Sequence, residues 1–163
     1  MSKVTIYPKR PCIGVDCSGQ PGKPPMIAVA TRWSRRDKQN KWIVKVAADQ
    51  INKYCSKRDW QEKIYASIVF KALDKVLEPN YEIHIDKDFP NPKKEQKVMG
   101  YLKYLIGCHH VGDATKEKPT ISFKTRRKSE YVKDAHVKHK LVNDDKMKID
   151  EKTSLDYLMK LLG

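Results

Sequence analysis

The chain has no long hydrophobic run and few cysteines. No stretch approaches the roughly 18 consecutive apolar residues that a membrane-spanning helix needs, and the opening sequence MSKVTIYPKRP lacks the apolar segment of a secretory signal. We therefore expect a cytoplasmic protein. The four cysteines show no C-x-x-C spacing, and a cytosolic chain of this size does not need disulfides. We expect them to be reduced and buried: Cys12, Cys17, Cys55 and Cys108.

Acidic residues are also scarce relative to basic ones. The chain has 20 Asp and Glu against 34 Lys and Arg, which gives a formal net charge of +14 and a pI near 9.6. Such an excess attracts polyanions and releases their counterions on binding, so nucleic acid is the first partner to consider. The alternative is a lysine-rich surface that only maintains solubility or belongs to an ion-pair-rich thermophilic protein.

Length and composition predict a single soluble domain. The chain has 163 residues, with 39% hydrophobic and 33% charged residues. This composition is too apolar for a disordered chain and too polar for a membrane protein. We expect one domain over residues 1–163, with a core at about 11–142 and a helical tail at 143–163.

Apolar patterns between turn residues predict the secondary structure. Helical periodicity and the positions of Pro79, Pro92 and Gly107 predict where the helices begin and end. Short runs of strand-forming residues predict the strands, and the short link after the second strand predicts a hairpin. The expected strands are 11–17, 26–33, 42–48, 81–86 and 120–124, and the expected helices are 59–77, 92–106, 129–142 and 153–162.

The order of these elements predicts an α/β fold. Three strands in a meander are followed by two helix-connected strands and a helical tail. Because such crossovers are right-handed and join parallel strands, we expect the fourth and fifth strands to run parallel to the first.

Four acidic residues lie at the ends of separate apolar segments. Asp16 and Asp86 fall on strands that should be neighbours about 4.8 Å apart, at the sheet edge where α/β proteins bind ligands. The strand face of Asp16 is small, because it also carries Gly14, and could admit a ligand. Glu62 and Asp134 lie on the apolar faces of helices. Since buried carboxylates need compensation, the set predicts a divalent-cation site.

The two acids in the first half of the chain, Asp16 and Glu62, also have structural explanations. Asp16 could form an ordinary turn before Ser18 and Gly19. Glu62 could form a capping box with Asp59, in the pattern D-x-x-E, which requires no chemistry.

The two acids in the second half of the chain, Asp86 and Asp134, also have structural explanations. Asp86 competes with Asp88 for the same role, and either could cap the turn before Phe89 and Pro90. Asp134 could form a salt bridge with a neighbouring lysine, Lys133 or Lys138.

With these residues, the chain resembles the ribonuclease H-like superfamily over residues 11–142. CIGVDCSGQ is similar to the first strand of that family with its catalytic aspartate, EKIYASIVFKAL to the first helix, IHIDKDF to the fourth strand and VKDAHVKHKL to the last core helix. The resemblance implies a mixed five-stranded sheet in the order 3-2-1-4-5, flanked by helices. It also implies phosphodiester hydrolysis with two Mg²⁺ or Mn²⁺ ions. The implied catalytic and metal-binding residues are Asp16, Glu62, Asp86 and Asp134.

Basic, aromatic and histidine residues near the expected site suggest nucleic-acid contacts. His136 could shuttle a proton or contact phosphate, or be a solvated helix residue. Trp33 and Trp42 could stack on bases or pack in the hairpin. We expect His84 to be packed, and assign no role to His109 and His110. The residues expected to contact phosphates are Arg35, Arg36, Lys87, Lys124, Arg126, Arg127 and Lys128.

Three functions remain open from the sequence. The first is a metal-dependent nuclease that acts on RNA/DNA hybrid or structured DNA. The second is a noncatalytic nucleic-acid-binding protein that retains the fold, because Cys17 stands where ribonucleases of the second type carry another acid. The third is a zinc module formed by Cys12, Cys17, Cys108 and His109.

Overall fold

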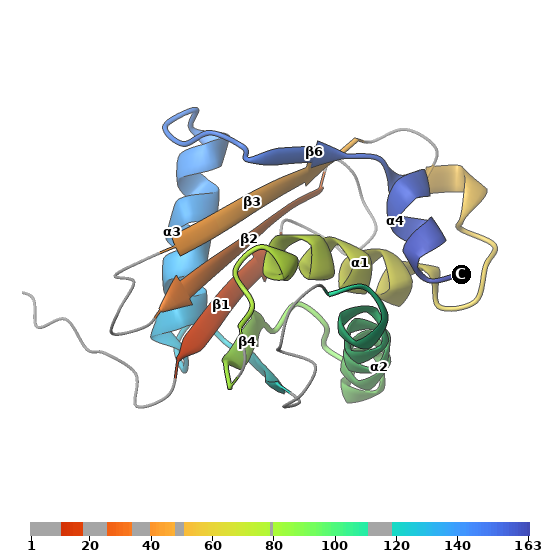
Figure 1. The fold of residues 1–163 in the computed structure, drawn as a ribbon, viewed down its shortest axis with the longest axis horizontal. Coiled ribbons are helices and arrows are strands. Elements are labelled where there is room, and N and C mark those ends of the chain that lie inside the picture. Colours follow the sequence, from red (N-terminus) through yellow and green to blue (C-terminus); the bar gives the residue numbers. More distant parts are fainter. Residues whose placement is uncertain (1–10, 18–25, 34–39, 48–50, 79, 111–118) are drawn as a thin grey trace, which may run out of the picture.

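A mixed β-sheet organises the fold in the computed structural model, which describes residues 11–17, 26–33, 40–47, 51–78, 80–110 and 119–163. In this part of the chain the sheet has six strands in the order β5-β4-β1-β2-β3-β6 (Figure 1). The strands are β1 (Cys12–Cys17), β2 (Met26–Trp33), β3 (Asn40–Val46), β4 (Glu82–Asp86), β5 (Thr120–Lys124) and β6 (Glu151–Thr153).

The order and directions of the strands confirm the predicted ribonuclease H-like sheet. β1, β2 and β3 are antiparallel neighbours, whereas β4 is parallel to β1 and β5 is parallel to β4. Five strands therefore follow the expected order 3-2-1-4-5. β6 adds a sixth strand, parallel to β3, which the sequence did not predict.

Helices cover both faces of the sheet. α3 lies on one face, and α1, α2 and α4 lie on the other (Figure 1). No helix in the described ranges is long and apolar enough to cross a bilayer. The helices are α1 (Trp60–Asp74), α2 (Pro92–His109), α3 (Glu130–Asn143) and α4 (Leu155–Leu161), with a short 3-10 helix at Ile51–Lys53.

The two faces of β1 explain this arrangement. Ile13, Val15 and Cys17 belong to the main apolar core, together with residues of α1. On the opposite face, a Cβ atom at Gly14 would lie only 2.1 Å from the backbone oxygen of Tyr131 in α3. The expectation that the small face admits a ligand is thus wrong at Gly14, because the backbone of α3 occupies that space.

The start of α1 differs from the predicted capping box. Asp59 is the N-cap residue, but its side chain makes no capping hydrogen bond and its φ is 55°. Its carboxylate instead accepts hydrogen bonds from Lys97 Nζ at 2.9 Å and Tyr101 Oη at 2.8 Å, both on α2. Asp59 therefore ties two helices together.

The later helices agree with the prediction at their starts. The Asn91 side chain caps α2 before Pro92, and Ser129 and Ser154 cap α3 and α4 in the same way. The predicted stop at Gly107 is wrong, because α2 continues to His109.

Candidate active site at the carboxyl ends of β1 and β4

The structure brings Asp16 and Asp86 together. Val15 of β1 and Ile85 of β4 are partners in the parallel register, so the next residue of each strand lies at the same end of the sheet. Both aspartates are buried, with 3% and 8% of their surface exposed. Their side chains form a hydrogen bond with each other.

The two carboxyl groups have opposite pKa shifts. Burial, followed by the hydrogen bond and charge of Asp16, raises the pKa of Asp86 to about 6. Burial alone would raise the pKa of Asp16, but hydrogen bonds from His139, Asp86 and His136 outweigh it and lower that pKa. Below pH 6 the pair therefore holds a proton on Asp86, while Asp16 is the ionised member.

Two histidines of α3 contact the same oxygen of Asp16. His139 Nδ1 lies 2.9 Å and His136 Nδ1 lies 3.2 Å from Asp16 Oδ2. The two histidines are three residues apart and therefore share a helix face. An ionised carboxylate oxygen accepts both bonds, so each Nδ1 carries a proton that it donates to Asp16.

Arg126 fixes the tautomer of His136. Its guanidinium nitrogen lies 2.6 Å from His136 Nε2. Because a guanidinium can only donate, Nε2 accepts, and His136 is neutral with its proton on Nδ1. His139 Nε2 is buried and has no hydrogen-bond partner among the described residues.

Asp88 is a third carboxyl group near the pair. Its Oδ2 accepts a hydrogen bond of 2.8 Å from the buried phenol of Tyr65. Burial raises the pKa of Asp88 to about 7, with help from the charges of Asp86 and Asp16 and against the Tyr65 hydrogen bond. Asp86 is therefore the partner of Asp16, and Asp88 lies beside them.

The other two predicted acids belong to helices α1 and α3. Glu62 is buried in the first turn of α1, and no hydrogen bond in the described part of the chain joins it to Asp16 or Asp86. Asp134 accepts a hydrogen bond of 2.6 Å from Lys138, one helical turn away. This ion pair is the structural alternative that the sequence suggested for Asp134.

Some of the predicted phosphate-contacting residues lie near the acids. The charge of Arg126 lowers the pKa values of both Asp86 and Asp88. Lys124 is the register partner of Asp86, and the exposed Lys87 pairs with Glu95 at 3.4 Å. Arg127 and Lys128 are exposed, whereas Arg35 and Arg36 lie outside the described residues.

The predicted aromatic and histidine residues mostly pack. Trp33 meets Tyr131 edge to face at 5.6 Å, and Trp42 Nε1 donates to Glu151 at 3.1 Å. His84 is buried between Ser129 and Glu82, as expected for a packed residue.

The cysteines are free, and their burial differs from the prediction. Cys12 and Cys17 are buried as expected, but Cys55 and Cys108 are exposed. No group of three or more His, Cys, Asp or Glu side chains in the described ranges is arranged to hold a metal ion. The alternative of a zinc module at Cys12, Cys17, Cys108 and His109 is therefore wrong.

The chemistry of the acid pair nevertheless suits a hard divalent cation. Asp16 and Asp86 supply carboxylate oxygens, which Mg²⁺ and Mn²⁺ prefer. Burial, followed by the hydrogen bond and charge of Asp16, raises the pKa of Asp86, and a bound cation would favour its ionised form. Asp88 offers another oxygen donor beside them. The chemistry of these aspartates therefore fits a divalent cation, and the contribution of Glu62 and Asp134 stays a prediction.

His139 is the contact that the sequence analysis missed. The signal was present in the segment HVKH, where two histidines at spacing i, i+3 follow the buried Ala135. The spacing of His136 from Asp134 does not reveal this contact, because residues two apart do not share a helix face, whereas His136 and His139 do.

No protein-family model matches this sequence, and no curated protein matches it significantly.

Proposed function

We propose that the protein is a metal-dependent nuclease of the ribonuclease H-like superfamily, which hydrolyses phosphodiester bonds in RNA/DNA hybrid or structured DNA. The observation that carries the proposal is the buried Asp16–Asp86 pair at the carboxyl ends of two parallel strands. This is where open α/β sheets bind their ligands. The net charge of +14 supports a polyanionic substrate.

Asp16 and Asp86 would hold the Mg²⁺ or Mn²⁺ ions, with Asp88 close by. Bound ions supply an activated water and charge stabilisation of the leaving oxygen. The roles of Glu62 and Asp134 as further ligands stay predictions from the resemblance. In this proposal His139 and His136 orient Asp16, since both donate to one of its oxygens.

Arg126 links the acids to the substrate in this proposal. Its guanidinium can exchange His136 Nε2 for a phosphate oxygen, because arginine binds phosphate with well-defined geometry. The exchange leaves the lone pair of His136 Nε2 free to accept a proton. Lys124, Arg127 and Lys128 would add phosphate contacts that position the substrate without reading its sequence.

A noncatalytic nucleic-acid-binding protein of the same fold is the second candidate. Its specific support is that one oxygen of Asp16 is already bound by two histidines. In addition, no group of three or more His, Cys, Asp or Glu side chains in the described residues has the arrangement of a metal site, although Asp88 is near the pair. Cation binding followed by hydrolysis separates the two candidates.

The test is a titration with Mg²⁺ and Mn²⁺, followed by cleavage assays on RNA/DNA hybrid, branched DNA and single strands. We expect metal-dependent cleavage that Asp16→Asn abolishes, while salt-sensitive substrate binding and folding are retained. The matched control is Asp145→Asn, which removes one exposed charge at a positive φ that asparagine tolerates. Cleavage that survives Asp16→Asn would refute the mechanism. Binding without cleavage in either metal would favour the second candidate.

A further inference from the structure

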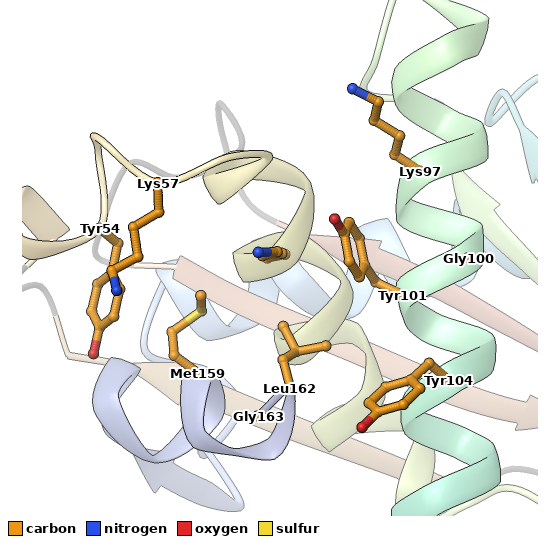
Figure 2. A pocket seen from close by; sticks show the side chains of 10 residues that line it. Tyr54, Lys57, Lys97, Gly100, Tyr101, Tyr104, Met159, Leu162 and Gly163 are labelled. Atoms are coloured by element: carbon orange, nitrogen blue, oxygen red, sulfur yellow. The ribbon is translucent and has the colours of Figure 1, made fainter.

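A separate groove of about 770 Å³ lies between α1, α2 and α4. Figure 2 shows Tyr101 and Tyr104 projecting from α2 toward Met159 and Leu162 at the C-terminal helix. Its volume lies within the range of about 300–1,000 Å³ that ligand-binding pockets occupy. None of the acids or histidines of the candidate active site lines it.

The groove is basic and aromatic. Lys57, Lys63 and Lys97 line it, and no Asp or Glu side chain does so among the described residues. Lys57 is exposed. Lys97 pairs with Asp59 at 2.9 Å, yet 48% of its side chain remains exposed. Lys63 lies over the ring of Tyr101 at 5.6 Å.

One face of α2 forms a wall of the groove on which planar groups could stack. Lys97, Gly100, Tyr101 and Tyr104 follow the pattern i, i+3, i+4, i+7 and therefore share one helix face. Tyr104 is 49% exposed, so its ring is accessible to a ligand. A Cβ atom at Gly100 would meet nothing within 4 Å, so open space lies against the helix there.

We infer that this groove binds a single strand of nucleic acid. Its bases would stack on Tyr104 and Tyr101, and its phosphates would contact Lys57, Lys63 and Lys97. Aromatic side chains beside a positive groove are the combination by which proteins bind single strands without sequence preference. Charge complementarity identifies the occupant as a polyanion, and the exposed ring of Tyr104 beside the half-buried ring of Tyr101 favours one that carries flat bases.

The groove and the candidate active site share α1. Lys63 lines the groove, and Tyr65, two residues later, donates its hydrogen bond to Asp88. A strand held in the groove would thus lie against the same helix that contacts the acids. That the bound strand is part of a cleaved substrate rests on the proposed function, whereas binding itself does not.

The test measures binding of fluorescein-labelled single-stranded DNA and RNA oligonucleotides by anisotropy, with EDTA present so that cleavage cannot occur. Gly100→Leu should fill the open space and weaken binding at least tenfold. The matched control is Gly107→Leu on the same helix, which also has nothing within 4 Å but does not line the groove. Tyr104→Ala should weaken binding about 5- to 160-fold, the range for loss of one base stack. A difference between the DNA and RNA arms identifies the preferred strand.

Two further arms identify the occupant. An abasic oligonucleotide of equal length should bind at least tenfold more weakly than the normal one. Equal binding of abasic DNA, or equal competition by polyglutamate, would overturn the inference in favour of an unspecific polyanion or an acidic protein. An unchanged affinity in Gly100→Leu would also overturn it.

Cleavage assays separate this inference from the proposed function. The wild-type protein could bind a single strand but cleave no substrate, with Gly100→Leu losing this binding. That result would support the groove as the binding site and reject the nuclease. Metal-dependent cleavage of strand-containing substrates at the same KM in Gly100→Leu and wild type would retain the nuclease and reject the groove as part of its substrate site.

Discussion

At the residue scale, Asp16 connects the elements of the candidate site. Its carboxylate contacts Asp86 from β4 and both histidines from α3. A charge with only 3% of its surface exposed needs such partners, because an unpaired buried carboxylate is strongly unfavourable. The same partners keep Asp16 ionised and leave the proton on Asp86, so the two acids differ in protonation although they are chemically alike.

The raised pKa values predict how stability depends on pH. The folded protein holds protons on Asp86 and Asp88 up to about pH 6 and 7, whereas an unfolded aspartate releases its proton near 3.8. The folded state thus binds more protons between about pH 4 and 7, and its stability falls as pH rises through this range. The lowered pKa of Asp16 acts in a different window, below about pH 4, where its contribution is lost as pH falls.

We therefore expect the melting temperature of the metal-free protein to fall by a few degrees between pH 5 and 8. Calorimetry in EDTA measures this change. Asp88→Asn should flatten the pH dependence, since it removes one of the two titrating groups, and the exposed Asp145→Asn should not change it. A melting temperature that rises steadily from pH 5 to 8, with the same slope in Asp88→Asn, would contradict the protonation assignment.

At the element scale, apolar patterning predicted the main sheet because its strands are buried runs such as MIAVATRW in β2. The polar segment Glu151–Thr153 could not be predicted, since its pairing with β3 relies on long-range bonds, including Ile43 N to Asp150 at 2.8 Å. The predicted strand order correctly placed Asp16 and Asp86 together at the carboxyl ends of neighbouring strands. The contact with His139 depends instead on how closely α3 approaches β1, which no local pattern specifies.

Gly14 allows the close approach of α3 to β1, and substituting it tests whether the position of α3 depends on this glycine. Gly14→Ala would place a methyl group 2.1 Å from the Tyr131 oxygen, so α3 must shift. We expect a loss of about 1–3 kcal/mol or more in the free energy of unfolding, measured with urea. Gly100→Ala is the matched control in an open helical position, and it should increase stability by about 0.5–1 kcal/mol. Equal effects of the two substitutions would show that α3 does not depend on Gly14 for its position.

At the scale of the whole molecule, charge and fold place two complementary surfaces around α1. The candidate active site gathers acids within a strongly basic protein, whereas the groove presents lysines and tyrosines. In the proposed nuclease, a divalent cation at the acids would reduce the repulsion between them and the phosphates of the substrate. The groove needs no cation, so strand binding and metal binding should be separable in experiment.

Salt dependence tests this separation. Each phosphate that a lysine neutralises on a single strand contributes a slope of about −0.7 to the logarithm of affinity against the logarithm of salt concentration. Lys57→Gln should therefore make the slope for a single-stranded oligonucleotide shallower by about 0.7, measured by anisotropy in EDTA. Lys148→Gln, at an exposed position outside the groove, is the charge-matched control and should leave the slope nearly unchanged. Equal changes in both variants would mean that the strand responds only to the net charge of +14, because a diffuse field does not distinguish one surface lysine from another.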